Sequence, residues 1–120
     1  MSPLEISRVL IKAAPEHLFD RFPPNTFPIE SRDGWSLVID DEMFDFFGLQ
    51  TAEWLDLAAG DELIYACREE RSTEFLHIRG GVCLREYRKY DGEVHDDRGT
   101  DPDTGVKDPY DIERYIAQYM

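Results

Sequence analysis

The sequence has few cysteines, no long apolar run and no recognisable leader, and each shortage excludes a class of protein. It contains two cysteines in 120 residues, Cys67 and Cys83, which are too few and too far apart for a disulfide framework or a zinc site. No stretch approaches the roughly 20 apolar residues needed to cross a bilayer. The N-terminus lacks the basic and apolar regions of a secretory signal. We therefore expect a cytoplasmic protein with free thiols.

Basic residues are also scarce, because 13 Lys and Arg stand against 26 Asp and Glu, giving a formal net charge of −13. Binding of nucleic acid needs a basic surface to contact phosphates, and anionic lipid likewise attracts basic segments. We therefore expect neither a nucleic-acid nor a membrane partner. Hydrophobic residues make up 42% of the chain, which is enough for a core and predicts one folded domain over residues 1–120 rather than an acidic tail.

The acidic excess is concentrated in two segments of the chain. Residues 33–62 contain nine acidic residues and no Lys or Arg, and residues 91–120 contain nine acidic and three basic residues. An even scatter of charge would be typical of an ordinary solubilising surface. The uneven distribution instead makes each acidic segment a candidate for binding a partner.

The first half of the chain predicts several short elements. Residues 4–13 fit a helix by the spacing of their apolar side chains and a strand by their β-branched residues, so both remain open. Residues 15–22 predict a short helix, and residues 35–39 predict a strand. Two further short helices are predicted at residues 40–47 and 52–58, each preceded by a residue that can cap it.

The second half predicts a sheet followed by a loop and a helix. Residues 62–90 contain three β-type runs, and Gly80-Gly81 between two of them is typical of a tight hairpin. Residues 91–108 are rich in acid, glycine and proline and predict a long acidic loop. Residues 108–120 predict a helix with Asp108 as its N-cap and Pro109 in its first turn.

Together these elements predict an α+β fold. Its mostly antiparallel sheet would be a meander at about residues 62–90, with the C-terminal helix packed on it and short helices near the N-terminus.

Catalytic chemistry has weak support in the sequence. His95, Asp96 and Asp97 place an imidazole beside two carboxylates, so a metal-dependent enzyme using these three residues is one alternative function. A metal site there would need further ligands from distant segments. Neither cysteine lies in an evidently basic environment that would activate it. The sequence contains no P-loop and no Gly-rich dinucleotide motif, so we expect a non-enzymatic protein without a cofactor.

Aromatic residues are interleaved with acids in the first acidic segment. Phe44, Phe46 and Phe47 cannot all point to one side of a helix, because consecutive residues diverge around its axis. One interpretation is a crowded corner of the core. The other is a binding surface with apolar anchors and an acidic rim, which is suited to a basic protein. The candidate partner-binding residues are Asp40, Asp41, Glu42, Asp45, Trp54, Asp56, Asp61 and Glu62.

Two stretches resemble known families. Residues 6–22, with an "APxxxF" sequence after a possible strand, resemble the opening of Bet v 1-like (START-related) domains, which implies small-molecule binding as an alternative. Residues 34–39 and 75–87, with an F-x-x-x-R-x-G-x-x-x-R hairpin, are similar to small bacterial immunity proteins of toxin systems. That resemblance implies a cytoplasmic inhibitor of one cognate toxin, often a basic nuclease. We therefore expect an immunity-type inhibitor that neutralises a basic partner protein.

Overall fold

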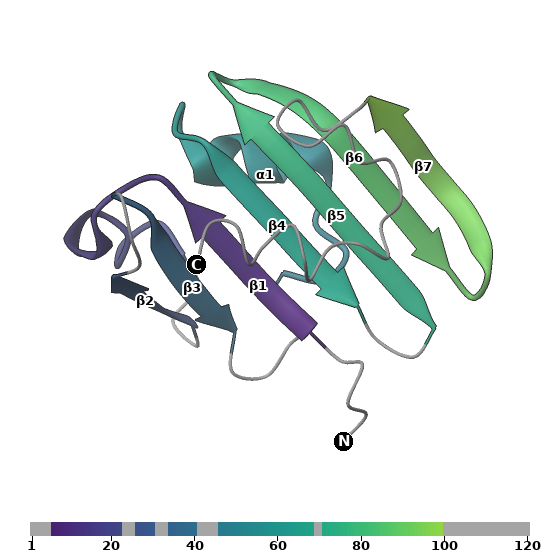
Figure 1. The fold of residues 1–120 in the computed structure, drawn as a ribbon, viewed down its shortest axis with the longest axis horizontal. Helices are drawn as coiled ribbons and strands as arrows, with labels where there is room; N and C mark the ends of the chain where they lie inside the picture. The colour runs from purple at the N-terminus through teal and green to yellow at the C-terminus, as the bar shows by residue number, and fades with distance from the viewer. Residues whose placement is uncertain (1–5, 23–25, 31–33, 41–45, 69–70, 100–120) are drawn as a thin grey trace.

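The protein forms one antiparallel sheet of seven strands in the computed structural model (Figure 1). The structure describes residues 6–22, 26–30, 34–40, 46–68 and 71–99. Across the sheet the strands follow the order β2-β3-β1-β4-β5-β6-β7. The strands are β1 (Ile6–Ile11), β2 (Thr26–Glu30), β3 (Ser36–Asp40), β4 (Leu63–Arg68), β5 (Ser72–Arg79), β6 (Val82–Tyr90) and β7 (Glu93–Gly99). A 3-10 turn, η1 (Pro15–His17), and one α-helix, α1 (Thr51–Ala58), complete the described elements.

The predicted α+β fold is wrong, because the described chain is mostly strand. The meander predicted at 62–90 is present as β4, β5 and β6. The sheet is larger than predicted, because β1, β3 and β2 extend it beyond β4, and β7 extends it beyond β6. Residues 15–22 supply a three-residue 3-10 turn in place of a helix. The C-terminal helix predicted at 108–120 lies outside the described residues.

Strand β1 resolves the alternative that the sequence left open for residues 4–13. Val9 and Ile11 are buried on one face of the sheet, and Leu10 is buried on the other. This alternation has the two-residue period of a strand. Because β1 pairs with both β3 and β4, it lies inside the sheet. β-Branched side chains are well suited to that position.

Strand β7 occupies part of the segment that was predicted as a loop. Residues 93–99 pair antiparallel with β6, with a bulge near Arg88 and Lys89. Backbone hydrogen bonds form this strand although its side chains are mostly polar and mostly exposed. Charged residues on an edge strand also discourage pairing with other chains.

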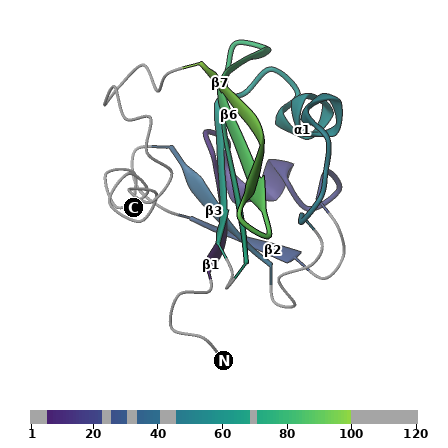
Figure 2. The same cartoon turned by 90° about the vertical axis from the view of Figure 1, so that its right-hand side faces the viewer.

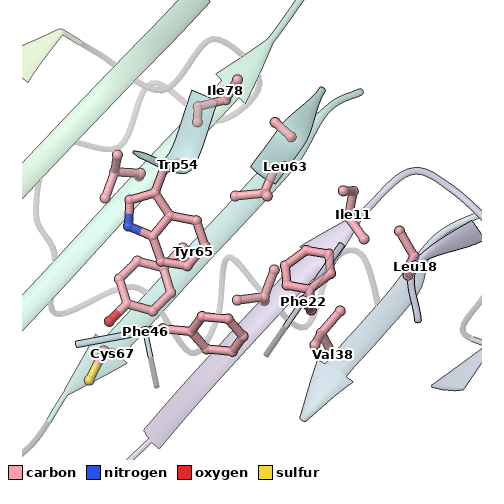
Figure 3. Packing of buried hydrophobic residues seen from close by; sticks show 13 residues of the cluster. Ile11, Leu18, Phe22, Val38, Phe46, Trp54, Leu63, Tyr65, Cys67 and Ile78 are labelled. Carbon is pink, nitrogen blue, oxygen red and sulfur yellow. The ribbon is translucent and has the colours of Figure 1, made fainter. Parts of the chain in front are cut away.

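Helix α1 and η1 lie on the same face of the sheet, as Figure 2 shows for α1. The main core fills the space beneath them. Its most central side chains are Trp54 and Ala58 of α1, Phe46 before α1, and Tyr65 of β4 (Figure 3). Within the described part of the chain, no helix combines the length and hydropathy required to span a membrane.

The opposite face of the sheet carries a second, smaller cluster of buried apolar residues. Its members are Leu10, Trp35, Leu37, Ile64, Ala66, Phe75 and Tyr87. The strands in the middle of the sheet are thus apolar on both faces.

Candidate protein-binding surface

The structure divides the eight candidate binding residues among different environments. Asp41, Glu42 and Asp45 lie outside the described residues. Asp40 ends β3. The remaining four are described, and they do not form one surface.

Trp54 belongs to the core and offers no anchor to a partner. Its side chain is 0% exposed. The indole stacks on the Tyr65 ring, with centroids 4.2 Å apart and planes 27° apart, and it also contacts Phe46 at a centroid distance of 5.4 Å. These three rings fill the space between α1 and the sheet (Figure 3). That packing also disfavours a Bet v 1-like ligand cavity at this place, since such a cavity needs an open apolar volume.

Glu62 is held in an ion-pair group on the face opposite α1. Its Oε2 lies 2.7 Å from His77 Nε2 and 2.8 Å from Arg79 Nη2. His77 pairs in the sheet with Ile64, a member of the cluster on that opposite face. Glu62 therefore stabilises local structure, at a distance from the acidic residues of α1.

Asp56 and Asp61 lie on and just after α1, and they differ in their surroundings. Asp56 is exposed on the helix. Asp61 pairs with Arg21 at 3.1 Å. The same guanidinium donates to the carbonyl oxygens of Leu57 and Ala58, at 2.6 and 2.7 Å, and so satisfies the C-terminal end of α1.

Glu53 was not among the candidates, although it is exposed on α1 three residues before Asp56. Residues three apart are neighbours on a helix surface. Its Oε1 accepts a hydrogen bond from the Gln50 backbone N–H at 3.2 Å, as part of a capping box. Its acidic position in the first turn is a signal that sequence reasoning could have used.

The two adjacent phenylalanines before α1 point in different directions. Phe46 is fully buried, whereas Phe47 is 36% exposed. Of the helix predicted at 40–47, residues 41–45 lie outside the described residues, and Phe46 and Phe47 form a bend and a turn in place of a helix. The Phe47 ring meets the Tyr90 ring edge to face at 5.9 Å, and Tyr90 meets His95 at 5.1 Å. We call these three side chains, Phe47, Tyr90 and His95, the aromatic row.

A buried carboxylate lies beneath the aromatic row. Glu74 is 1% exposed. It accepts a hydrogen bond from the Tyr65 hydroxyl at 2.8 Å and another from the Tyr90 hydroxyl. The backbone N–H of Gly48 lies 3.2 Å from both of its oxygens. Gly48 has a φ of 83°, a left-handed conformation that favours glycine.

The environment of Glu74 keeps the two phenols protonated. Burial is the main cause that raises the pKa of the Tyr65 and Tyr90 hydroxyls, and the neighbouring Glu74 raises each pKa further. A neutral phenol can donate its proton to the carboxylate, whereas a phenolate would repel it.

Arg88 forms a second buried group beside α1. Its guanidinium donates to Leu49 O and Thr51 Oγ1, each at 3.2 Å, and pairs with Glu86 at 3.3 Å and Asp96 at 3.2 Å. Burial alone would lower the pKa of Arg88, but its hydrogen bonds to the two carboxylates raise it overall. The start of α1 is therefore fixed to β6 and β7.

His95, Asp96 and Asp97 do not converge on a metal. Asp96 pairs with Arg88, and Asp97 pairs with Arg85 at 2.9 Å. Consecutive residues of a strand point to opposite faces, so the two carboxylates lie on opposite sides of β7. Among the described residues, no group of three or more His, Cys, Asp or Glu side chains is placed to hold a metal ion.

Cys83 is also unsuited to nucleophilic chemistry. Burial is the main cause that raises the pKa of its thiol to about 11, and the nearby Glu86 contributes. The thiol is therefore protonated at neutral pH.

Comparisons with protein-family models, curated proteins and solved structures found no match for this chain.

Proposed function

We propose that this protein is a non-enzymatic, immunity-type inhibitor that acts in the cytoplasm and neutralises a basic partner, such as a toxin domain. The observation that best supports the proposal is the acidic surface of α1. Glu53 and Asp56 are exposed there, within a segment from 46 to 62 that contains no Lys or Arg.

Electrostatics give this surface a physical role. A net charge of −13 attracts basic proteins and repels acidic ones over several ångströms. Exposed charges of one sign accelerate association with an oppositely charged surface, and their effect weakens as salt increases. Because α1 is anchored through Arg88 at its start and Arg21 at its end, its carboxylates are presented on a rigid support.

The experiment is a titration against the basic domains of proteins encoded by adjacent genes, measured by surface plasmon resonance at several salt concentrations. The Asp56→Lys variant should lower the association rate of a partner roughly two- to tenfold at low salt. The matched control is Glu16→Lys, which makes the same charge change at an exposed position in η1.

Binding of a basic domain that is weakened by Asp56→Lys more than by Glu16→Lys supports the proposal. Equal association rates for the wild type and Asp56→Lys at low salt would reject α1 as the binding surface. The absence of binding by every basic neighbour product would reject the inhibitor function itself.

A further inference from the structure

We propose that the aromatic row is the anchor point for an arginine side chain of the basic partner. This inference deepens the proposed function and rests on it. It adds a specific contact between the aromatic row and one side chain of the partner, beyond general charge attraction. It also predicts that this contact favours arginine over lysine.

The aromatic row brings together residues that are far apart in the sequence. Phe47 precedes α1, Tyr90 ends β6, and His95 lies on β7. Their rings meet at centroid distances of 5.9 and 5.1 Å, with interplanar angles of 79° and 60°. Phe47 and His95 are exposed, and Tyr90 between them is half-buried. The row therefore offers a continuous aromatic surface to a partner.

The row is held from beneath, which lowers the cost of binding. Glu74 accepts hydrogen bonds from the Tyr90 hydroxyl and from the Gly48 N–H, directly after Phe47. One buried carboxylate thus fixes the Tyr90 ring and the backbone next to Phe47. A pre-organised anchor loses less conformational entropy when a partner binds than a mobile one does.

The charge around the row selects a cation. Glu93 lies opposite Tyr90 in the β6–β7 ladder, and Asp91 lies in the turn between these strands; both are exposed. The positive charge of Arg88 is already paired with Glu86 and Asp96.

Two other basic residues lie at this end: Lys89 precedes Tyr90 in β6 and therefore points to the opposite face of the sheet, and the carbonyl oxygen of Arg71 accepts a hydrogen bond from the Asp91 N–H at 2.9 Å. Arg71 is exposed, so beside the aromatic row the two carboxylates of Asp91 and Glu93 outnumber this one exposed guanidinium.

Arginine fits this combination better than lysine does. A guanidinium is planar, stacks on aromatic faces and forms paired hydrogen bonds with carboxylates, whereas an ammonium is a compact and strongly hydrated point charge. A second copy of this chain is a poor occupant, because two molecules of charge −13 repel each other.

The test is an NMR titration of the full chain with three peptides, hexa-arginine, hexa-lysine and hexa-glutamate, and with the neutral aromatic compound N-acetyltryptophanamide. We expect hexa-arginine to bind more tightly than hexa-lysine and to shift the resonances of Phe47, Tyr90, His95 and Glu93 most. Phe47→Ala should weaken hexa-arginine binding about two- to fivefold, and Phe47→Trp should preserve or strengthen it.

The matched control is Phe27→Ala, because Phe27 is 44% exposed on β2, at the other edge of the sheet. It should leave hexa-arginine binding unchanged. Thermal unfolding of both variants checks that the partly exposed Phe47 is not needed for folding.

Three results would overturn the inference. One is equal binding of hexa-arginine by Phe47→Ala and Phe27→Ala, and another is equal affinity for the arginine and lysine peptides. The third is preferential binding of N-acetyltryptophanamide at the row. If Asp56→Lys weakens a basic partner while Phe47→Ala does not, the inference fails and the proposed function stands; if no basic partner binds, the proposed function fails by its own test.

Discussion

Glu74 and Arg88 lie directly opposite each other on β5 and β6, and each holds a different part of the segment that leads into α1. Glu74 accepts the Gly48 N–H, and Arg88 donates to the Leu49 carbonyl and the Thr51 hydroxyl. Two buried charged side chains thus fix residues 48–51 to the sheet. These contacts anchor the residues between Phe47 and the first turn of α1.

Replacing Glu74 by leucine should lower the free energy of unfolding by about 2–4 kcal/mol, because Tyr65 and Gly48 would lose their buried acceptor. Urea unfolding monitored by tryptophan fluorescence measures this change. Glu74→Gln keeps an acceptor oxygen and should cost less. The control Glu93→Gln removes an exposed carboxylate and should change stability by less than about 0.5 kcal/mol; an equal cost for Glu93→Gln and Glu74→Leu would contradict the role of Glu74.

Replacing Arg88 by methionine should destabilise the protein by about 3–5 kcal/mol, because Glu86 and Asp96 would lose their buried partner and keep an ion pair with the exposed Arg98. Hydrogen exchange should also become faster in α1, because Leu49 and Thr51 lose the Arg88 donor and Thr51 then relies on its hydrogen bond to Glu86 of β6. Arg98→Met is the control, since that side chain is 74% exposed and its ion pairs contribute little. Unchanged exchange in α1 would show that Arg88 does not hold the helix.

The raised pKa values of Tyr65 and Tyr90 predict a loss of stability at high pH. Their unfolded-state pKa is close to the ordinary value of 10.0, so unfolding releases phenolic protons above that pH. The stabilisation is therefore fully present below about pH 10 and decreases as the pH rises towards the folded-state pKa. Urea unfolding between pH 8 and 11 should show a smaller decrease for the double variant Tyr65→Phe, Tyr90→Phe. Parallel curves for the variant and wild type would disprove this origin.

Trp54→Ala should cost about 3–5 kcal/mol of stability, as expected for a large side chain removed from a packed core. Trp54→Phe should cost less, because it keeps a ring on Tyr65 and removes an indole N–H that has no hydrogen-bond partner among the described residues. Thermal unfolding gives both values. If Trp54→Phe weakened a basic partner as strongly as Asp56→Lys without lowering stability, the core assignment of Trp54 would be wrong.

Part of the fold could be predicted because local patterns specify it. The strand predicted at 35–39 is confirmed as β3 within one residue, and the helix predicted at 52–58 is confirmed as α1. Strand β7 could not be predicted, because its mostly polar residues show no hydrophobic alternation. Its stability comes from backbone hydrogen bonds to β6, which the sequence pattern does not reveal. Residues 15–22 show the opposite case, because their spacing of apolar side chains predicts a helix, whereas the structure forms only a 3-10 turn at residues 15–17.

The candidate site was only partly accessible to the same reasoning. The side chains of adjacent phenylalanines were expected to point in different directions. The sequence could not show, however, that Phe46 enters the core and Phe47 stays partly exposed. Nor could it show that Trp54 would be buried, since its acidic neighbours equally suited a surface. Glu74 gave no signal, because its partners Gly48 and Tyr90 lie far away along the chain.

The sequence by itself determined the net charge of −13 and the base-free acidic segment at residues 33–62, because charge depends on composition and order alone. It also determined the central meander, through side-chain alternation and the Gly80-Gly81 turn. Only the tertiary structure decided which acidic residues remain exposed and which are paired. Ion pairs such as Glu62 with Arg79, and ring contacts such as Phe47 with Tyr90, join residues that only folding brings together.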